Sequence, residues 1–293
     1  MLWIILTASA APLQVARNAL QRGLVGDAGP WGATLVRFLF GLPFSVLTFA
    51  VVAALSPSAR PHFTTAFWLG ACLGGLAQIG ATAALLVAMR RAGFAVATAL
   101  QQSSLPLAAV FGVAALGDQL SAVGWAGVAA ATAGLTILSW PSQAQAEGTL
   151  RGAALGLASG AAFAVALNAY RQAGQALEPT HPVYAGTAGV CVAQAMQTIA
   201  LTSFLAVTRP ASLRAVTASW RQSLGAGFFG SAASACWFSA LALAPAAAVR
   251  AVGVLEIPFA AMAGNRLFQE RMSWRQAAGA ALAAAGVAAA ALG

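Results

Sequence analysis

Long apolar stretches follow one another along almost the whole chain, and only short polar joints separate them. A helix that crosses the hydrocarbon core of a bilayer needs about 20 consecutive, mostly apolar residues. Only 7% of the residues are charged and 60% are hydrophobic, whereas a soluble domain carries roughly a quarter charged residues. The chain therefore belongs in a lipid bilayer, and the pattern excludes a soluble domain, a disordered segment and a disulfide scaffold.

Charges, prolines and glycines divide the chain into two sets of spans. The first set is expected at residues 2–21, 31–55, 65–89, 95–116 and 121–139. The second set is expected at residues 151–172, 183–207, 217–243, 247–267 and 274–292. We predict an all-α integral membrane protein of ten transmembrane helices, built from two five-helix halves. The halves are expected at residues 1–140 and 150–293, joined by the polar linker 141–149.

The two halves resemble each other when the sequence is shifted by 152 residues. Alanine matches arise by chance in an alanine-rich chain. The other identical pairs are Thr65 and Thr217, Trp68 and Trp220, Gly75 and Gly227, Pro106 and Pro258, Gly112 and Gly264, Ser121 and Ser273, Gly127 and Gly279, and Gly134 and Gly286, and Asp118 aligns with Glu270. A half with an odd number of helices brings the next half into the membrane from the opposite side. The sequence therefore predicts inverted repeats, an architecture that suits transport by alternating access.

An acidic joint precedes the last predicted span of each half. These joints are Gly117-Asp118-Gln119-Leu120-Ser121 and Gln269-Glu270-Arg271-Met272-Ser273, and Gly127 and Gly279 follow them. Together with the two five-helix halves, they resemble the EamA-type transporters of the drug/metabolite transporter superfamily, most closely the YddG-like branch of amino-acid exporters. That pattern usually has Glu in both joints, so Asp118 is a conservative departure. The resemblance implies a secondary exporter with both termini in the cytoplasm.

Polar side chains inside the spans are candidates for substrate contacts, because they are costly in hydrocarbon. Glutamine can both donate to a carboxylate and accept from an ammonium group, and an aromatic ring can stack on an apolar substrate. The predicted substrate-binding residues are Asn18, Gln78, Gln101, Gln102, Asn168, Tyr170, Trp237 and Arg250. Hydrogen bonding or packing between helices is the alternative for each, and for Arg250 extension to a lipid headgroup is a further alternative.

Polar residues at helical spacing form one stripe in the first span and another in the sixth. The first stripe is Gln14, Arg17, Asn18 and Gln21, and the second is Asn168, Arg171, Gln172 and Gln175. Since a shift of 150 residues places Asn18 on Asn168, the two stripes are predicted to line a shared cavity. For the outer members of both stripes, a position at the membrane surface is the alternative.

Glu256 is the one acidic residue expected deep in a span. A buried carboxylate can take up and release protons, so Glu256 is the candidate for proton coupling or for binding a substrate ammonium group. The alternative is a structural ion pair. Arg250 lies about 240° around a continuous helix from Glu256 and is not expected to face it, which leaves Arg17 or Arg37 on other helices. The repeat-mates Pro106 and Pro258 are predicted hinges, because proline interrupts a helix.

No metal site and no cofactor are expected. Cys72, Cys191 and Cys236 are dispersed in apolar runs, and His62 and His181 are expected in solvated loops. A chain without lysine cannot contain the phosphate loop of nucleotide-driven pumps. No nucleic-acid partner is expected, because the arginines form no basic run.

These observations favour a secondary exporter of small amphiphilic metabolites, with apolar and aromatic amino acids first, working around a central cavity in a bacterial-type inner membrane. A multidrug or organic-cation exporter is the alternative. A membrane enzyme acting on a lipid-linked substrate is disfavoured, because the spans hold no Cys/His pair and no paired carboxylates. Ten helices are enough for a monomer to enclose a cavity.

Most arginines lie at odd-numbered joints, which favours both termini outside, against the orientation that the resemblance implies.

Overall fold

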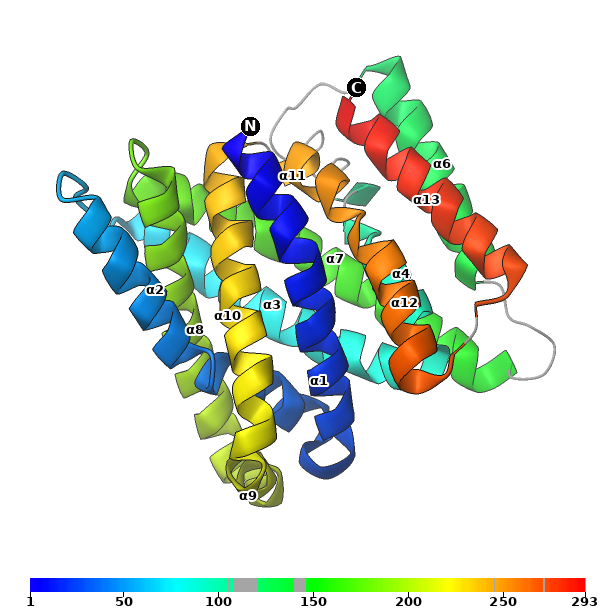
Figure 1. Ribbon diagram of the computed structural model, residues 1–293, viewed down its shortest axis with the longest axis horizontal. Helices are drawn as coiled ribbons and strands as arrows, with labels where there is room; N and C mark the ends of the chain where they lie inside the picture. Colours follow the sequence, from blue (N-terminus) through cyan, green and yellow to red (C-terminus); the bar gives the residue numbers. More distant parts are fainter. Residues whose placement is uncertain (105, 108–120, 140–145, 245, 271, 293) are drawn as a thin grey trace. The chain divides into compact units, whose positions relative to one another are not determined.

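The computed structural model describes residues 1–104, 106–107, 121–139, 146–244, 246–270 and 272–292 (Figure 1). In these ranges the chain forms α-helices joined by short connections. Helical segments that are long and apolar enough to cross a membrane are Leu2–Leu55, Thr65–Ala92, Leu150–Leu177, Pro182–Thr208 and Trp220–Leu243. A shorter apolar helix covers Ala122–Ile137. These segments support a multi-pass membrane protein, and the count of ten spans stays a prediction.

The helices divide the chain much as the apolar pattern predicts. They are α1 (Leu2–Leu39), α2 (Leu42–Leu55), α3 (Thr65–Ala92), α4 (Phe94–Gln101), α6 (Ala122–Ser139), α7 (Ala146–Leu177), α8 (Pro182–Thr208), α9 (Pro210–Ala218), α10 (Trp220–Leu243), α11 (Ala246–Gly253), α12 (Glu256–Phe268) and α13 (Trp274–Leu292). Part of the predicted span 95–116 and the joint residues Gly117 to Leu120, which include Asp118, lie outside the described residues.

Two predicted joints differ from the structure, and a third is confirmed. The joint between the first two spans is present, because non-helical backbone at Gly29, whose φ of 69° favours glycine, separates two helices within α1 just before Pro30. Gln21 Nε2 donates to the Ala33 carbonyl at 2.7 Å, so the chain reverses direction between these residues. A further helix, α9, occupies the joint before α10. The last residues of the predicted linker belong to α7, which begins at Ala146.

The chain folds into two compact units, each of which draws on both predicted halves. The first unit contains Met1–Ile79 and Val165–Pro245, and the second contains Gly80–Ala164 and Ala246–Gly293. The boundaries of the sequence halves remain a prediction about the repeat, since the spatial units cut across them.

In the first unit, α1 and α10 lie side by side (Figure 1). Small residues permit this close approach of two helices. A Cβ atom added at Gly227 would lie 2.4 Å from the carbonyl carbon of Phe40, and one added at Gly41 would lie 3.2 Å from the Gly227 oxygen. Glycines at both positions let the backbone of α10 touch the turn between α1 and α2, as small residues do in tightly packed membrane helices.

In the second unit, α6 and α13 form an equally close pair (Figure 1). A Cβ atom added at Gly134 would lie 2.3 Å from the Ala283 nitrogen, and one added at Gly286 would lie 2.2 Å from the Ala131 nitrogen. Gly134 and Ala131 align with Gly286 and Ala283 at the shift of 152 residues. Each helix therefore packs a glycine against the equivalent alanine of the other helix, as expected for two related halves.

Replacing Gly286 by Ala is expected to destabilise the protein by about 2 kcal/mol, because the new methyl group overlaps the α6 backbone. Unfolding in detergent measures the change. Gly80→Ala in α3 is the matched control, since no atom lies within 4 Å of its added Cβ, and alanine favours the helix by up to about 1 kcal/mol. Equal effects of the two substitutions would contradict the close contact.

Glu178 ties two connections of the first unit together. Its carboxylate is 5% exposed. It accepts hydrogen bonds from the Arg60 backbone at 2.9 Å and from the Thr180 nitrogen at 3.0 Å, as well as from the Thr180 hydroxyl. His181 lies 3.5 Å from the same carboxylate and 3.0 Å from the Ser58 hydroxyl. The connection between α2 and α3 is thereby fixed to the one between α7 and α8.

The bonds from Thr180 and from the Arg60 backbone lower the pKa of the Glu178 carboxyl to about 2. An unfolded Glu titrates near 4.3, so the stabilisation is full above about pH 4.3 and is lost as the pH falls toward 2. We therefore expect Glu178→Gln to destabilise the protein by a constant amount between about pH 8 and pH 5, and by less in stronger acid. Thermal unfolding against pH measures this, and a difference that shrinks near neutral pH would contradict it.

Candidate functional site

Two helices of the second unit are interrupted at positions that the repeat relates. Helix α4 ends at Gln101, and the chain turns at Gln102 and Ser103 before it is helical again at Ser104. Helix α11 ends at Gly253, and the chain turns at Val254 and Leu255 before α12 begins at Glu256. When the sequence is shifted by 152 residues, the last residue of α4 aligns with the last residue of α11. The residues at which the helices begin again, Ser104 and Glu256, align with each other as well.

The prolines explain where the breaks fall. Proline has no N–H group and its ring clashes with the carbonyl of the residue four positions earlier. For Pro106 that residue is Gln102, and for Pro258 it is Val254, the first turn residue in each case. Tighter bonds replace the helical ones, from the Ser103 nitrogen to Leu100 at 3.1 Å and from the Leu255 nitrogen to Val252 at 3.2 Å. The predicted hinge positions therefore coincide with real interruptions of the helices, whereas movement at them stays a proposal.

The two breaks bring four polar side chains into one buried cluster. Arg250 Nη1 lies 3.6 Å from Glu256 Oε1, and these side chains are 3% and 0% exposed. Gln102 bridges them, since it accepts from Arg250 at 3.0 Å and donates to Glu256 at 3.2 Å. Arg250 also donates to the Ser104 hydroxyl at 2.9 Å. A buried ion pair is retained only when further hydrogen bonds accompany it, and Gln102 and Ser104 supply these bonds.

The prediction that Arg250 does not face Glu256 is wrong. The angle of about 240° holds for a continuous helix, but the chain between these residues leaves the helix at Val254 and Leu255. Arg250 stands at the end of α11 and Glu256 at the start of α12, so the turn places them together. The extension of Arg250 to a lipid headgroup is also wrong, because the side chain is enclosed in the second unit.

Glu270 holds the beginning of the broken helix α4. Its Oε2 accepts a hydrogen bond from the Phe94 backbone nitrogen at 2.6 Å. Gly93, with φ of 93°, lies against the same carboxylate. A carboxylate at a helix N-terminus satisfies a free N–H group and complements the helix dipole. The acidic joint therefore acts as a cap that positions α4.

The first unit contains a second buried polar group, on α3, α7 and α8. Tyr170 donates to Gln78 Oε1 at 3.0 Å, and the Gln197 amide donates to the same oxygen at 2.8 Å and to the Tyr170 hydroxyl at 3.2 Å. Gln78 and Tyr170 were predicted as substrate contacts, and the structure brings them together. Gln197 was missed, although Gln194 and Gln197 stand one helical turn apart in an apolar span.

Two arginines of α1, Arg17 and Arg37, are each 1% exposed. Arg17 donates to Asn18 Oδ1 and to Gln14 Oε1, and Arg37 donates to the Ser234 hydroxyl at 3.1 Å. The sequence left Arg17 between the cavity and the membrane surface, and the structure encloses it. The role of Asn18 as a substrate contact stays a prediction, and Asn18 is hydrogen-bonded to the buried Arg17.

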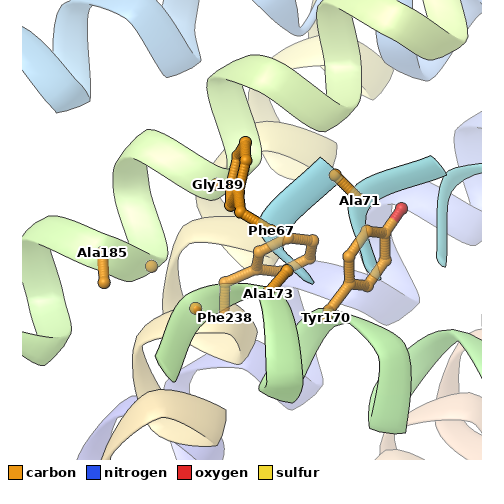
Figure 2. A pocket seen from close by; sticks show the side chains of 9 residues that line it. Phe67, Ala71, Tyr170, Ala173, Ala185, Gly189 and Phe238 are labelled. Atoms are coloured by element: carbon orange, nitrogen blue, oxygen red, sulfur yellow. The ribbon is translucent and has the colours of Figure 1, made fainter. Parts of the chain in front are cut away.

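Tyr170 also lines a small cavity between α3, α7, α8 and α10 (Figure 2). The aromatic rings of Phe67, Tyr170 and Phe238 surround it, and the centroids of Tyr170 and Phe238 are 4.3 Å apart. Gly186 and Gly189 leave space on the side of α8. The cavity has an apolar and aromatic lining, but its volume of about 10 Å³ admits no more than a water molecule in this conformation.

The other predicted residues are spread over both units. Gln101 is buried at the end of α4, and Trp237 is buried on α10 without lining this cavity. Asn168 and Arg171 are half-buried on α7. Gln172 and Gln175 are exposed, so the second polar stripe is only partly enclosed. Among the described residues no group of His, Cys, Asp and Glu is arranged to hold a metal ion.

Comparison with known proteins supports the resemblance at the level of the superfamily. The EamA-like transporter family matches residues 150–292. That match indicates a membrane transporter of the drug/metabolite type. The EamA-like match is consistent with a protein that is not an enzyme, and it implies a small-molecule substrate and a lipid bilayer. No curated protein matches the chain.

Sixteen chains of solved structures also match. One of them, titled "Crystal structure of protein", is 19% identical, with a TM-score of 0.56. It covers 99% of this chain, which in turn covers 96% of that structure. At this identity the likeness shows the fold alone, and it extends over both predicted halves.

Removing one member of the buried ion pair is expected to cost about 3–5 kcal/mol of stability, because the other charge stays enclosed. In a double-mutant cycle, Glu256→Gln with Arg250→Met should therefore cost clearly less than the sum of the single changes. Unfolding in detergent measures all four proteins. Arg209→Met is the control, since Arg209 is exposed, and additive effects at positions 250 and 256 would contradict the pairing.

Proposed function

We propose that this protein is a secondary exporter of small amphiphilic metabolites, above all apolar and aromatic amino acids, which works by alternating access around a central cavity. One observation carries the proposal: a carboxylate and a guanidinium are enclosed at paired breaks in apolar helices. In transporters, interrupted helices and intramembrane charges mark the path of substrates and coupling ions. The EamA-like match supports the transporter class.

Contacts for both parts of an amphiphilic substrate are available in the first unit. The Gln78, Tyr170 and Gln197 group offers amide and hydroxyl atoms, and Phe67 and Phe238 offer an apolar surface beside it. Asn18, Asn168 and Trp237 extend the polar and aromatic surfaces of the same unit. In the second unit, Gln101, Gln102 and Arg250 are the proposed contacts.

Glu256 is the proposed coupling group. Its partner Arg250 and the bridging Gln102 both contact the carboxylate in the conformation described here. Bending at Pro106 and Pro258 would move α12 relative to α11 and separate Glu256 from Arg250. A carboxylate released in this way can bind a proton or a substrate ammonium group. Charge pairing and helix bending are thus parts of one step in the proposed cycle.

An organic-cation exporter is the second candidate. It is favoured by the aromatic lining of the cavity, because rings attract cations. It is opposed by the buried arginines, which repel cations.

We place the protein in a bacterial-type inner membrane, and a monomer is the proposed functional form. A C-terminal alkaline phosphatase fusion tests the orientation of the termini, because the fused enzyme is active only when the C-terminus is outside.

Purified protein in liposomes is expected to exchange labelled phenylalanine for internal phenylalanine, and to respond to a proton gradient. Glu256→Gln should abolish the response to the gradient, and Pro258→Ala should slow exchange several-fold. Asp27→Asn is the matched control, since Asp27 is exposed on α1, and it should change neither. Exchange of organic cations without exchange of any amino acid would refute the substrate class, and an unchanged gradient response in Glu256→Gln would refute the coupling role.

A further inference from the structure

Arg17 and Arg37 pack against the same glycine of the neighbouring helix. A Cβ atom added at Gly230 of α10 would lie 3.2 Å from Arg17 Cδ and 3.4 Å from Arg37 Cβ. Both side chains therefore leave α1 toward α10, although 20 positions separate them in sequence. A guanidinium is always charged, and its flat set of N–H groups matches the two oxygen atoms of a carboxylate.

Arg17 fixes the orientation of the amide beside it. Its Nε and Nη2 donate to Asn18 Oδ1 at 3.1 and 2.5 Å. Because arginine can only donate, the Asn18 oxygen faces the guanidinium and the Asn18 nitrogen points away. Within the described ranges Asn18 Nδ2 is buried and has no hydrogen-bond acceptor. A buried donor in this state is costly unless a ligand supplies the acceptor.

Helix α10 contributes a second donor next to Gly230. Ser231 is 1% exposed, and its hydroxyl has no hydrogen-bond partner in the described part of the chain. Helical serines commonly bond to the carbonyl four residues earlier, and Ser231 does not. One turn further along the same helix, Ser234 accepts from Arg37. Arg37 of α1 thus contacts Ser234 of α10, and Ser231 lies about one turn before Ser234 on the same helix.

We propose that Arg17, Asn18, Arg37, Ser231 and Ser234 form an anion-binding site between α1 and α10, and that its ligand is the carboxylate of the transported substrate. This inference rests on the proposed transport function and makes the substrate an anion or a zwitterion. Carboxylates bind such sets of guanidinium and hydroxyl donors through short, charge-assisted hydrogen bonds.

The neutral acceptors around the arginines suit a site that must also release its ligand. Gln14, Asn18 and Ser234 accept hydrogen bonds from the two guanidiniums. These bonds lower the cost of burying the charges, so in the proposed site a carboxylate replaces some of these acceptors when it binds. Because the carboxylate replaces existing hydrogen-bond acceptors, the site selects an anion while its affinity stays low enough for the substrate to be released.

The test compares phenylalanine with phenylalaninamide, which keeps the ring and the ammonium group but replaces the carboxylate by a neutral amide. Calorimetric titration of the full-length protein in lipid nanodiscs at about pH 6 keeps both amines protonated. Phenylalanine is expected to bind about tenfold more tightly than the amide. Arg37→Met should remove this preference, and Ser231→Ala should reduce it about threefold, as expected for one hydrogen bond.

Ser239→Ala is the matched control. Ser239 is a buried serine of the same helix, and it lies against Gly186 of α8. This substitution should leave the preference for phenylalanine unchanged. If size-exclusion chromatography shows that Arg37→Met does not fold, Ser231→Ala and Asn18→Ala decide the question.

Equal binding of the two probes, binding of neither, or an unchanged preference in both Ser231→Ala and Asn18→Ala would overturn the anion site. The transport assay separates this result from failure of the proposed function. Exchange of an organic cation by a protein without carboxylate preference would leave a transporter that lacks this site. A carboxylate preference without any exchange in liposomes would leave the site and refute the transporter.

Discussion

The ion pair between Arg250 and Glu256 is the interaction on which the second unit depends. In an apolar helical bundle an isolated charge is strongly destabilising, so each of these side chains requires a close partner. A continuous helix would hold them on different faces. The break between α11 and α12 brings them to 3.6 Å, and Gln102 from the equivalent break joins both. Helix interruption and charge compensation are therefore one structural feature.

Irregular backbone is tolerated in a membrane only where protein or a water-filled cavity satisfies its polar groups. The turns at Gln102–Ser103 and Val254–Leu255 meet this condition through short backbone bonds and through the side chains around them. Glu270 meets it at the start of α4. The same residues that make the breaks possible thus supply the polar groups of the unit.

Besides the carboxylate of Glu178, the first unit encloses two arginines. Arg17 and Arg37 are surrounded by amides and hydroxyl groups, and a hydrogen-bonded group of Gln78, Tyr170 and Gln197 lies on other helices of the unit. The anion site proposed above lies among these groups, and the small aromatic cavity lies in the same unit.

The sequence by itself determined the membrane environment, most helix boundaries and the special positions of Pro106, Pro258 and Glu256, because hydrophobicity, proline geometry and the cost of buried charge act locally. It also placed Glu270 in an acidic joint without giving that joint a role. Only the tertiary structure decided that Arg250 faces Glu256, that Arg17 and Arg37 converge on Gly230 and that Gln197 joins Gln78. Those contacts depend on where a helix is interrupted and on which helices are neighbours, and neither follows from the spacing of residues along one helix.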